Sequence, residues 1–181
     1  MAPTPWLLAG VLLLVAVQMQ LILHPGGVAR GLPHPDVVQS TCNSTAFYDL
    51  CVAALAADPN SSTADVPGLC AIAVSAAAAN ASATASFLTG AANASSILRT
   101  CAAKYANASE ALLAARVSLA EEAYDYAMVH VSAAAEYPAV CRTLFRRRRY
   151  PPELATREEG LRRLCTIALD IISLLQTTHG H

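Results

Sequence analysis

The sequence predicts an all-α protein: a four-helix bundle in up-down-up-down order, preceded by a short N-terminal helical hairpin. Three observations support this prediction. Alanine supplies 38 of the 181 residues, apolar residues recur at spacings of three and four, and the predicted helices are joined by short connections. Alanine has the highest helix propensity and is depleted in strands, which excludes an all-β fold. Helices of about 20 residues form rods of about 30 Å that pack side by side.

The first helical segment is expected from about residue 37 to residue 57. Cys42 and Cys51 lie within it, nine positions apart, across a stretch that must turn. A disulfide bond between them would close a small loop and hold two short helices together as a hairpin.

The second predicted helix covers residues 69–88. Thr63 and Asp65 precede it as N-cap residues. Pro67 fits the first turn, and Gly90 is expected to end the helix.

Three further helices are predicted from apolar stripes at helical spacing. The third helix carries Cys101, Tyr105, Ala108, Leu112, Ala115 and Leu119. The fourth, from about residue 122 to residue 145, carries Ala123, Tyr126, His130, Ala133, Tyr137 and Val140. The last follows Pro151 and Pro152, begins with a Thr-Arg-Glu-Glu capping box at residues 156–159, and carries Leu161, Cys165, Ala168, Ile172 and Leu175.

An apolar run, WLLAGVLLLVAV, lies near the N-terminus and ends at Val17. It is short for a membrane span, which needs about 20 residues. Small residues at Gly27 and Ala29 fit signal-peptidase cleavage, so we expect a signal peptide over residues 1–29, with an uncleaved membrane anchor as the alternative. The remaining chain divides into a short N-terminal segment, a helical domain and a tail: residues 30–36, 37–177 and 178–181.

Cysteine and asparagine usage also indicates secretion. The chain has six cysteines, and an even number suits an oxidising compartment. Five N-x-S/T sequons are candidates for N-glycosylation, at Asn43, Asn60, Asn80, Asn93 and Asn107. We therefore expect an extracellular protein with no membrane association after signal cleavage.

The other four cysteines can be assigned from their places along the predicted helices. Cys101 is near the start of the third helix and Cys141 near the end of the fourth. These ends are neighbours in an antiparallel pair, so we expect a disulfide bond there. Cys70 and Cys165 are expected at different depths in the bundle, too far apart for the Cα separation of about 7 Å or less that a disulfide needs. We interpret both as buried free thiols.

An ordered set of motifs resembles the plant invertase and pectin methylesterase inhibitor family. It comprises Cys42-x8-Cys51, LAADPNSSTADVPGL, CAAKYANASEAL, VSAAAEYPAVCRTLF and LCTIALDIISLL, and it covers about residues 37–177. The resemblance implies a non-catalytic protein of the apoplast or cell wall that blocks a secreted carbohydrate-active enzyme. The family's disulfide bonds match Cys42–Cys51 and Cys101–Cys141, and its free cysteine in the last helix matches Cys165.

The expected partner is pectin methylesterase, with invertase as the alternative. The invertase-directed branch has Pro-Lys-Phe at the start of the fourth helix, where this chain has Tyr124-Asp125-Tyr126. Ser132-Ala133-Ala134 is more similar to the pectin methylesterase branch, whose third and fourth helices cover the enzyme cleft. The third-helix face that is acidic in the family retains only Glu110 here. The resemblance therefore implies a contact through Tyr105, Glu110, Tyr124 and Ser132 or their exposed neighbours.

Other classes of function remain as alternatives. A secreted bundle that signals through a receptor shares this architecture, and a wall or pollen protein could keep the scaffold without inhibition. We expect no catalytic activity, metal or cofactor, because no nucleophile–base pair or metal-ligand cluster appears.

The charge pattern excludes a basic nucleic-acid-binding protein, because the net charge is −1. Eight of the twelve Lys and Arg residues nevertheless lie between Arg142 and Arg163. Within that stretch, Arg146–Arg149 is interpreted as a solvated loop or as a site for acidic pectin, an anionic wall surface or a processing protease.

Overall fold

The structure, a computed structural model, describes residues 35–91 and 95–179, which belong to one compact unit. The predicted signal peptide, the final two residues and the sequon at Asn93 lie outside the described residues. The elements in chain order are α2 (Pro35–Asn43), α3 (Tyr48–Ala56), the 3-10 turn η1 (Pro59–Ser62), α4 (Val66–Ala91), α5 (Ser96–Ala120), α6 (Tyr124–Leu144) and α7 (Pro152–His179).

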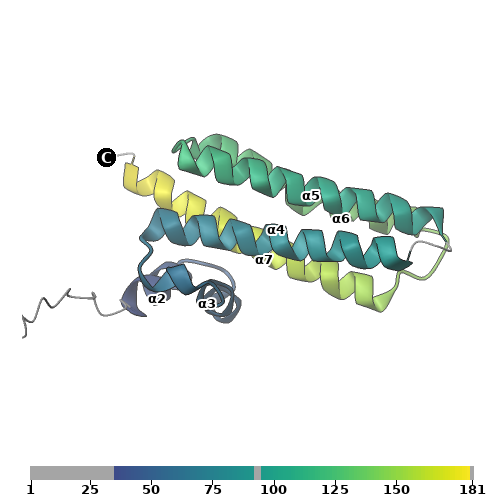
Figure 1. Ribbon diagram of the computed structural model, residues 1–181, viewed down its shortest axis with the longest axis horizontal. Helices are drawn as coiled ribbons and strands as arrows, with labels where there is room; N and C mark the ends of the chain where they lie inside the picture. Colours follow the sequence, from purple (N-terminus) through teal and green to yellow (C-terminus); the bar gives the residue numbers. More distant parts are fainter. Residues whose placement is uncertain (1–34, 92–94, 180–181) are drawn as a thin grey trace, which may run out of the picture. The chain divides into compact units, whose positions relative to one another are not determined.

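The four long helices form the predicted bundle. Successive helices run in opposite directions, so the order is up-down-up-down (Figure 1). Helix α4 packs against α5 and α7, and α6 packs against the same two helices from the other side. The short helices α2 and α3 pack on each other as the predicted hairpin. The all-α prediction is confirmed.

Helix α4 begins at Val66 and ends at Ala91, three residues beyond the predicted range of 69–88 at each end. Oδ1 of Asp65 accepts a hydrogen bond of 2.9 Å from the backbone N–H of Gly68, which caps the helix. The hydroxyl of Thr63 instead donates to the carbonyl of Asn60 and does not cap α4. The helix continues through Gly90 to Ala91, so the predicted stop at Gly90 is wrong.

Helix α4 is also long and apolar enough to span a membrane, by length and composition alone. It packs against α5 and α7, and nine of its residues are buried. It therefore packs as one of the four helices of the bundle.

The capping box predicted for the last helix is wrong. Helix α7 begins at Pro152. Proline has no backbone N–H, but N–H groups in the first turn have no acceptor within the helix, so proline is favourable there. Thr156 therefore lies one turn inside the helix, and its hydroxyl donates to the carbonyl of Pro152 over 3.1 Å. A proline in the first turn outweighs a threonine four positions later as a start signal.

The predicted interior stripes of α5 and α7 are confirmed, because every residue in them is buried. The stripe predicted for α6 is wrong by about one position. The residues of α6 that are buried are Ala127, Val131, Ala134, Pro138 and Cys141. Both sets follow helical spacing, but only the second contains Cys141, which must face α5 to reach Cys101.

The structure joins Cys42 to Cys51, with Cα atoms 5.6 Å apart, and Cys101 to Cys141, with Cα atoms 5.2 Å apart. Cys70 and Cys165 are free and buried. Burial raises the pKa of each of these two thiols to about 12. They therefore remain protonated and unreactive in the folded protein.

Polar and aromatic contacts attach the hairpin to α7. The backbone N–H of Ala46 donates to Oδ2 of Asp170 over 2.9 Å. The guanidinium of Arg163 lies 5.3 Å from the centre of the Phe47 ring, within range of a cation–π interaction. The hairpin also packs on α4, so it lies on the side of the bundle formed by α4 and α7, away from α5 and α6.

Candidate target-binding face

The Cys101–Cys141 bond sets the register between α5 and α6. In an antiparallel pair each step forward on one helix matches a step back on the other, so Glu110 lies at the level of Ser132. Both side chains are exposed. Two of the four residues predicted to contact a partner are therefore exposed at the same level of the bundle.

Tyr105 does not belong to this face, and the prediction is corrected. Its side chain is fully buried on the interior stripe of α5, so it cannot contact a partner of the folded protein. Desolvation, followed by the nearby charge of Glu158, raises its pKa well above the ordinary value. Its hydroxyl has no hydrogen-bond partner among the described residues.

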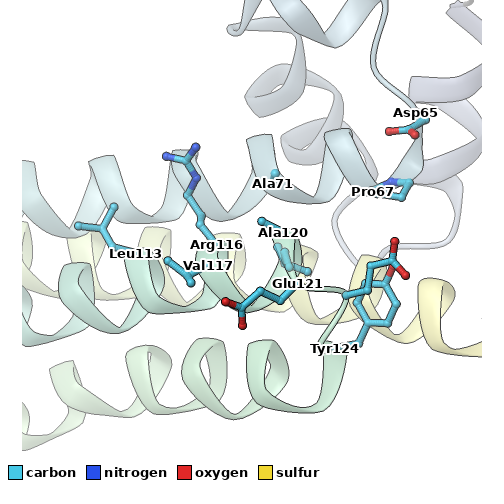
Figure 2. Close-up of a pocket in the computed structure, with 11 residues that line it drawn as sticks. Asp65, Pro67, Ala71, Leu113, Arg116, Val117, Ala120, Glu121 and Tyr124 are labelled. Carbon is cyan, nitrogen blue, oxygen red and sulfur yellow. The ribbon is translucent and has the colours of Figure 1, made fainter.

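Tyr124 lies at the first position of α6, half-buried, and about 12 Å along the helix from Ser132. It borders a hollow of about 840 Å³ between the start of α4 and the end of α5 (Figure 2). Apolar and charged side chains share the lining, among them Pro67, Leu113, Arg116, Val117 and Glu121. The hollow offers a recess for a side chain of a partner protein.

The turn between α5 and α6 carries backbone strain. Glu122 has φ 55°, the left-handed region that favours glycine. The N–H of Ala123 donates to the carbonyl of Ser118, and the N–H of Glu122 to that of Leu119, which is the Schellman pattern of a helix end. The second acid of the turn is therefore held at the edge of the hollow in a conformation that costs free energy.

Helix α6 has a second apolar stripe that is exposed. Tyr126 is 69% exposed and Val129 64%, while Val140 and Leu144 are each 39% exposed. At 3.6 residues per turn these four side chains fall within an arc of roughly 60°. Two of them, Val129 and Leu144, lie outside the stripe predicted from the sequence, and the other two, Tyr126 and Val140, were predicted to be interior.

This apolar stripe faces away from α7. The opposite flank of α6 carries Arg142, whose guanidinium donates hydrogen bonds to Glu158 of α7. The exposed stripe therefore lies toward the α5 side of α6. We call the outer surface made by Glu110, Tyr126, Val129 and Ser132 the α5–α6 face.

The predicted glycosylation sites differ in their surroundings. Asn43 and Asn60 are exposed, and Asn107 is half-buried on α5. Asn80 is half-buried in the middle of α4, its Oδ1 is buried, and its Nδ2 lies near Gly160 of α7. The packing of α4 on α7 thus leaves little space for a glycan on Asn80.

Within residues 35–91 and 95–179, no three His, Cys, Asp or Glu side chains gather where they could hold a metal ion. The surface features of these residues are an apolar face, a hollow at one end of it and a basic loop. A disulfide-linked helical bundle with such a face is a scaffold for binding another protein.

Comparison with known proteins identifies the family. Residues 36–171 match the model of the plant invertase/pectin methylesterase inhibitor family. The chain is 55% identical over 159 residues to pectinesterase inhibitor 28 of Oryza sativa subsp. japonica, covering 78% of this chain and 70% of that protein. It is 42% identical over 149 residues to cell wall / vacuolar inhibitor of fructosidase 2 of Arabidopsis thaliana, covering 77% of this chain and 83% of that protein.

Solved structures show the same fold. A crystal structure of a pectin methylesterase inhibitor from Arabidopsis thaliana has a TM-score of 0.57 at 21% identity, and covers 78% of this chain and 97% of that one. A mutant form of a pectin methylesterase inhibitor from Arabidopsis has a TM-score of 0.60 at 22% identity, covering 76% of this chain and 95% of that one. The chain belongs to the plant invertase/pectin methylesterase inhibitor family.

Proposed function

We propose that this protein is a secreted, non-catalytic inhibitor of pectin methylesterase that forms a 1:1 complex through the α5–α6 face. The observation that carries the proposal is the exposed apolar stripe of α6 beside α5, in a chain 55% identical to a pectinesterase inhibitor. Exposed apolar patches on small secreted proteins mark sites of protein contact. The apolar run that ends at Val17 supports secretion.

The chemistry of the face fits a partner surface with an apolar centre and a polar rim. Tyr126 and Val129 supply the centre, and tyrosine is enriched among residues that dominate binding energy. Glu110 and Ser132 supply exposed polar groups beside it. A complex of standard size buries about 1,600 Å² in total, so the contact extends along both helices.

Inhibition of invertase is the second candidate. The 42% identity to an Arabidopsis inhibitor of fructosidase favours it. Tyr124, Asp125 and Tyr126 occupy the place where that branch has Pro-Lys-Phe, and the carboxylate of Asp125 already binds Gln176. The absence of a lysine at this place in the sequence favours pectin methylesterase as the target.

Substitution of one tyrosine on the face and one outside it tests the proposal. Tyr126→Ala removes the most exposed aromatic side chain of the face, and Tyr48→Ala removes an aromatic side chain that is 40% exposed on the hairpin. We expect Tyr126→Ala to weaken inhibition of pectin methylesterase by roughly 30-fold, as loss of a dominant contact does, and Tyr48→Ala to leave it unchanged.

Both variants are prepared on an Asn107→Gln background, so that a glycan on α5 does not mask the result. Equal inhibition constants for the two tyrosine variants would show that the contact lies elsewhere. A large loss with Tyr48→Ala alone would place it on the hairpin.

A further inference from the structure

The loop between α6 and α7 carries four consecutive arginines, Arg146–Arg149, and all four are exposed. None of the four guanidinium groups has an ion-pair or hydrogen-bond partner among the described residues. The other four arginines between residues 142 and 163 each form an ion pair with a glutamate.

The acids nearby are already engaged. Residues 142–163 contain three acids against eight bases. Glu153 pairs with Arg157, Glu158 with Arg142, and Glu159 with Arg162 and Arg163. The positive charge of the loop therefore has no counter-charge within this stretch of the protein.

Both ends of the loop are fixed. Phe145, before the arginines, is buried, and its ring packs edge-to-face on that of Tyr150, 5.3 Å away. The phenol of Tyr150 donates a hydrogen bond of 2.8 Å to Glu158, and the guanidinium of Arg142 lies 4.8 Å from the centre of its ring. The four arginines are thus presented between two anchored aromatic residues, not on a free tail.

We propose that Arg146–Arg149 binds a carboxylated polysaccharide, the polymer left when the methyl esters of pectin are hydrolysed. This inference rests on the proposed function, which places the protein beside an enzyme that produces such a polymer. A guanidinium group matches a carboxylate in shape and can form two parallel hydrogen bonds with it. A polymer with a carboxylate on each sugar engages several arginines at once.

Other polyanions fit the loop less well. Binding of single-stranded nucleic acid uses exposed aromatic rings as stacking surfaces, whereas Phe145 is buried and Arg142 lies over the ring of Tyr150. Anionic lipids that attract basic segments belong to the cytoplasmic leaflet, whereas the proposed protein is extracellular.

The loop is separate from the α5–α6 face. Ser132 and Leu144 are about 18 Å apart along α6, and the arginines follow beyond the end of the helix. Polymer binding and enzyme inhibition are therefore expected to be separable by mutation.

Two double variants with the same change in net charge test the proposal. Arg147→Gln/Arg148→Gln removes two unpaired charges, and Arg162→Gln/Arg163→Gln removes two that are paired with Glu159. The mature protein is titrated with polygalacturonate and with the same polymer fully methyl-esterified, at physiological ionic strength. We expect binding to polygalacturonate alone, weakened roughly fivefold or more by the loop variant and by no more than about twofold by the control.

Three results would overturn the inference: equal binding of both polymers, equal loss in both double variants, or equally tight binding of DNA or phosphatidylserine vesicles. Inhibition of pectin methylesterase, measured on the same preparations, separates the two proposals. Inhibition without polymer binding refutes the inference alone. Polymer binding without inhibition refutes the proposed function and leaves the polysaccharide site standing.

Discussion

The phenol of Tyr150 donates a hydrogen bond of 2.8 Å to Oε2 of Glu158, and this bond closes the loop between α6 and α7 onto the first turns of α7. The same carboxylate accepts hydrogen bonds of 3.2 and 3.0 Å from Arg142. Its charge also contributes to the raised pKa of the buried Tyr105, although no bond joins them in the described structure. The hydroxyl of Tyr150 therefore has a hydrogen-bond partner, whereas the hydroxyl of Tyr105 has none among the described residues.

Removal of the unsatisfied hydroxyl is expected to be harmless or stabilising. Tyr105→Phe keeps the buried ring and removes a polar atom that has no partner among the described residues. We expect a free energy of unfolding equal to or above that of the wild type in urea titrations. Tyr105→Ala is the comparison, because the cavity it leaves should cost about 3–5 kcal/mol. A clear loss of stability in Tyr105→Phe would show that the hydroxyl has an unseen partner.

The strained turn gives a second prediction. Glu122→Gly relieves the left-handed backbone at φ 55° and should raise the free energy of unfolding by roughly 0.5–1 kcal/mol after the entropy cost of glycine. Glu122→Ala keeps the strain and serves as the control. If the alanine variant gains as much as the glycine variant, the side chain and not the backbone is responsible.

The thiols give a third prediction. Burial raises the pKa of Cys70 and Cys165 to about 12, so a thiol reagent at pH 8 should label neither in the native protein and both after unfolding without reductant. Peptide mapping of the non-reduced protein should yield the Cys42–Cys51 and Cys101–Cys141 pairs. A peptide linking Cys70 to Cys165, or rapid native labelling, would contradict this.

Acid should remove a stabilising contribution of Glu159. Its hydrogen bonds to Arg162 and then Arg163 lower its pKa from 4.5 to about 2. A lowered folded-state pKa stabilises the protein above the unfolded pKa, and this contribution is lost as pH falls from about 4.5 toward 2. The difference in urea midpoint between wild type and Glu159→Gln should therefore shrink between pH 6 and pH 2. A difference that stays constant over this range would mean that the ionised carboxylate contributes nothing.

Helix number, order and most interior residues could be predicted because alanine content and helical spacing report local preference and burial directly. In α5 and α7 the apolar stripe read from the spacing is the buried one, although α5 also exposes Leu113 and Val117. Helix α6 carries two such stripes, and spacing alone does not say which one faces the core. Cys141 was the available signal, because its bond to Cys101 turns one of the two stripes inward.

The binding face was harder to predict for the same reason. Glu110 and Ser132 are exposed as expected, but Tyr105 is buried and the exposed Val129 was missed. Tyr105 lies on the interior stripe predicted for the third helix. An aromatic residue at such a position packs in the core and does not contact a partner. Exposure depends on which flank the neighbouring helix covers, and that is a property of the assembled bundle.

Titration of the purified mature protein against pectin methylesterase and cell-wall invertase in parallel distinguishes the proposed target from its alternative. We expect residual pectin methylesterase activity to fall linearly to a break at one inhibitor per enzyme, and invertase activity to be unchanged. Inhibition of invertase with no effect on pectin methylesterase, or no inhibition of either enzyme, would contradict the proposal.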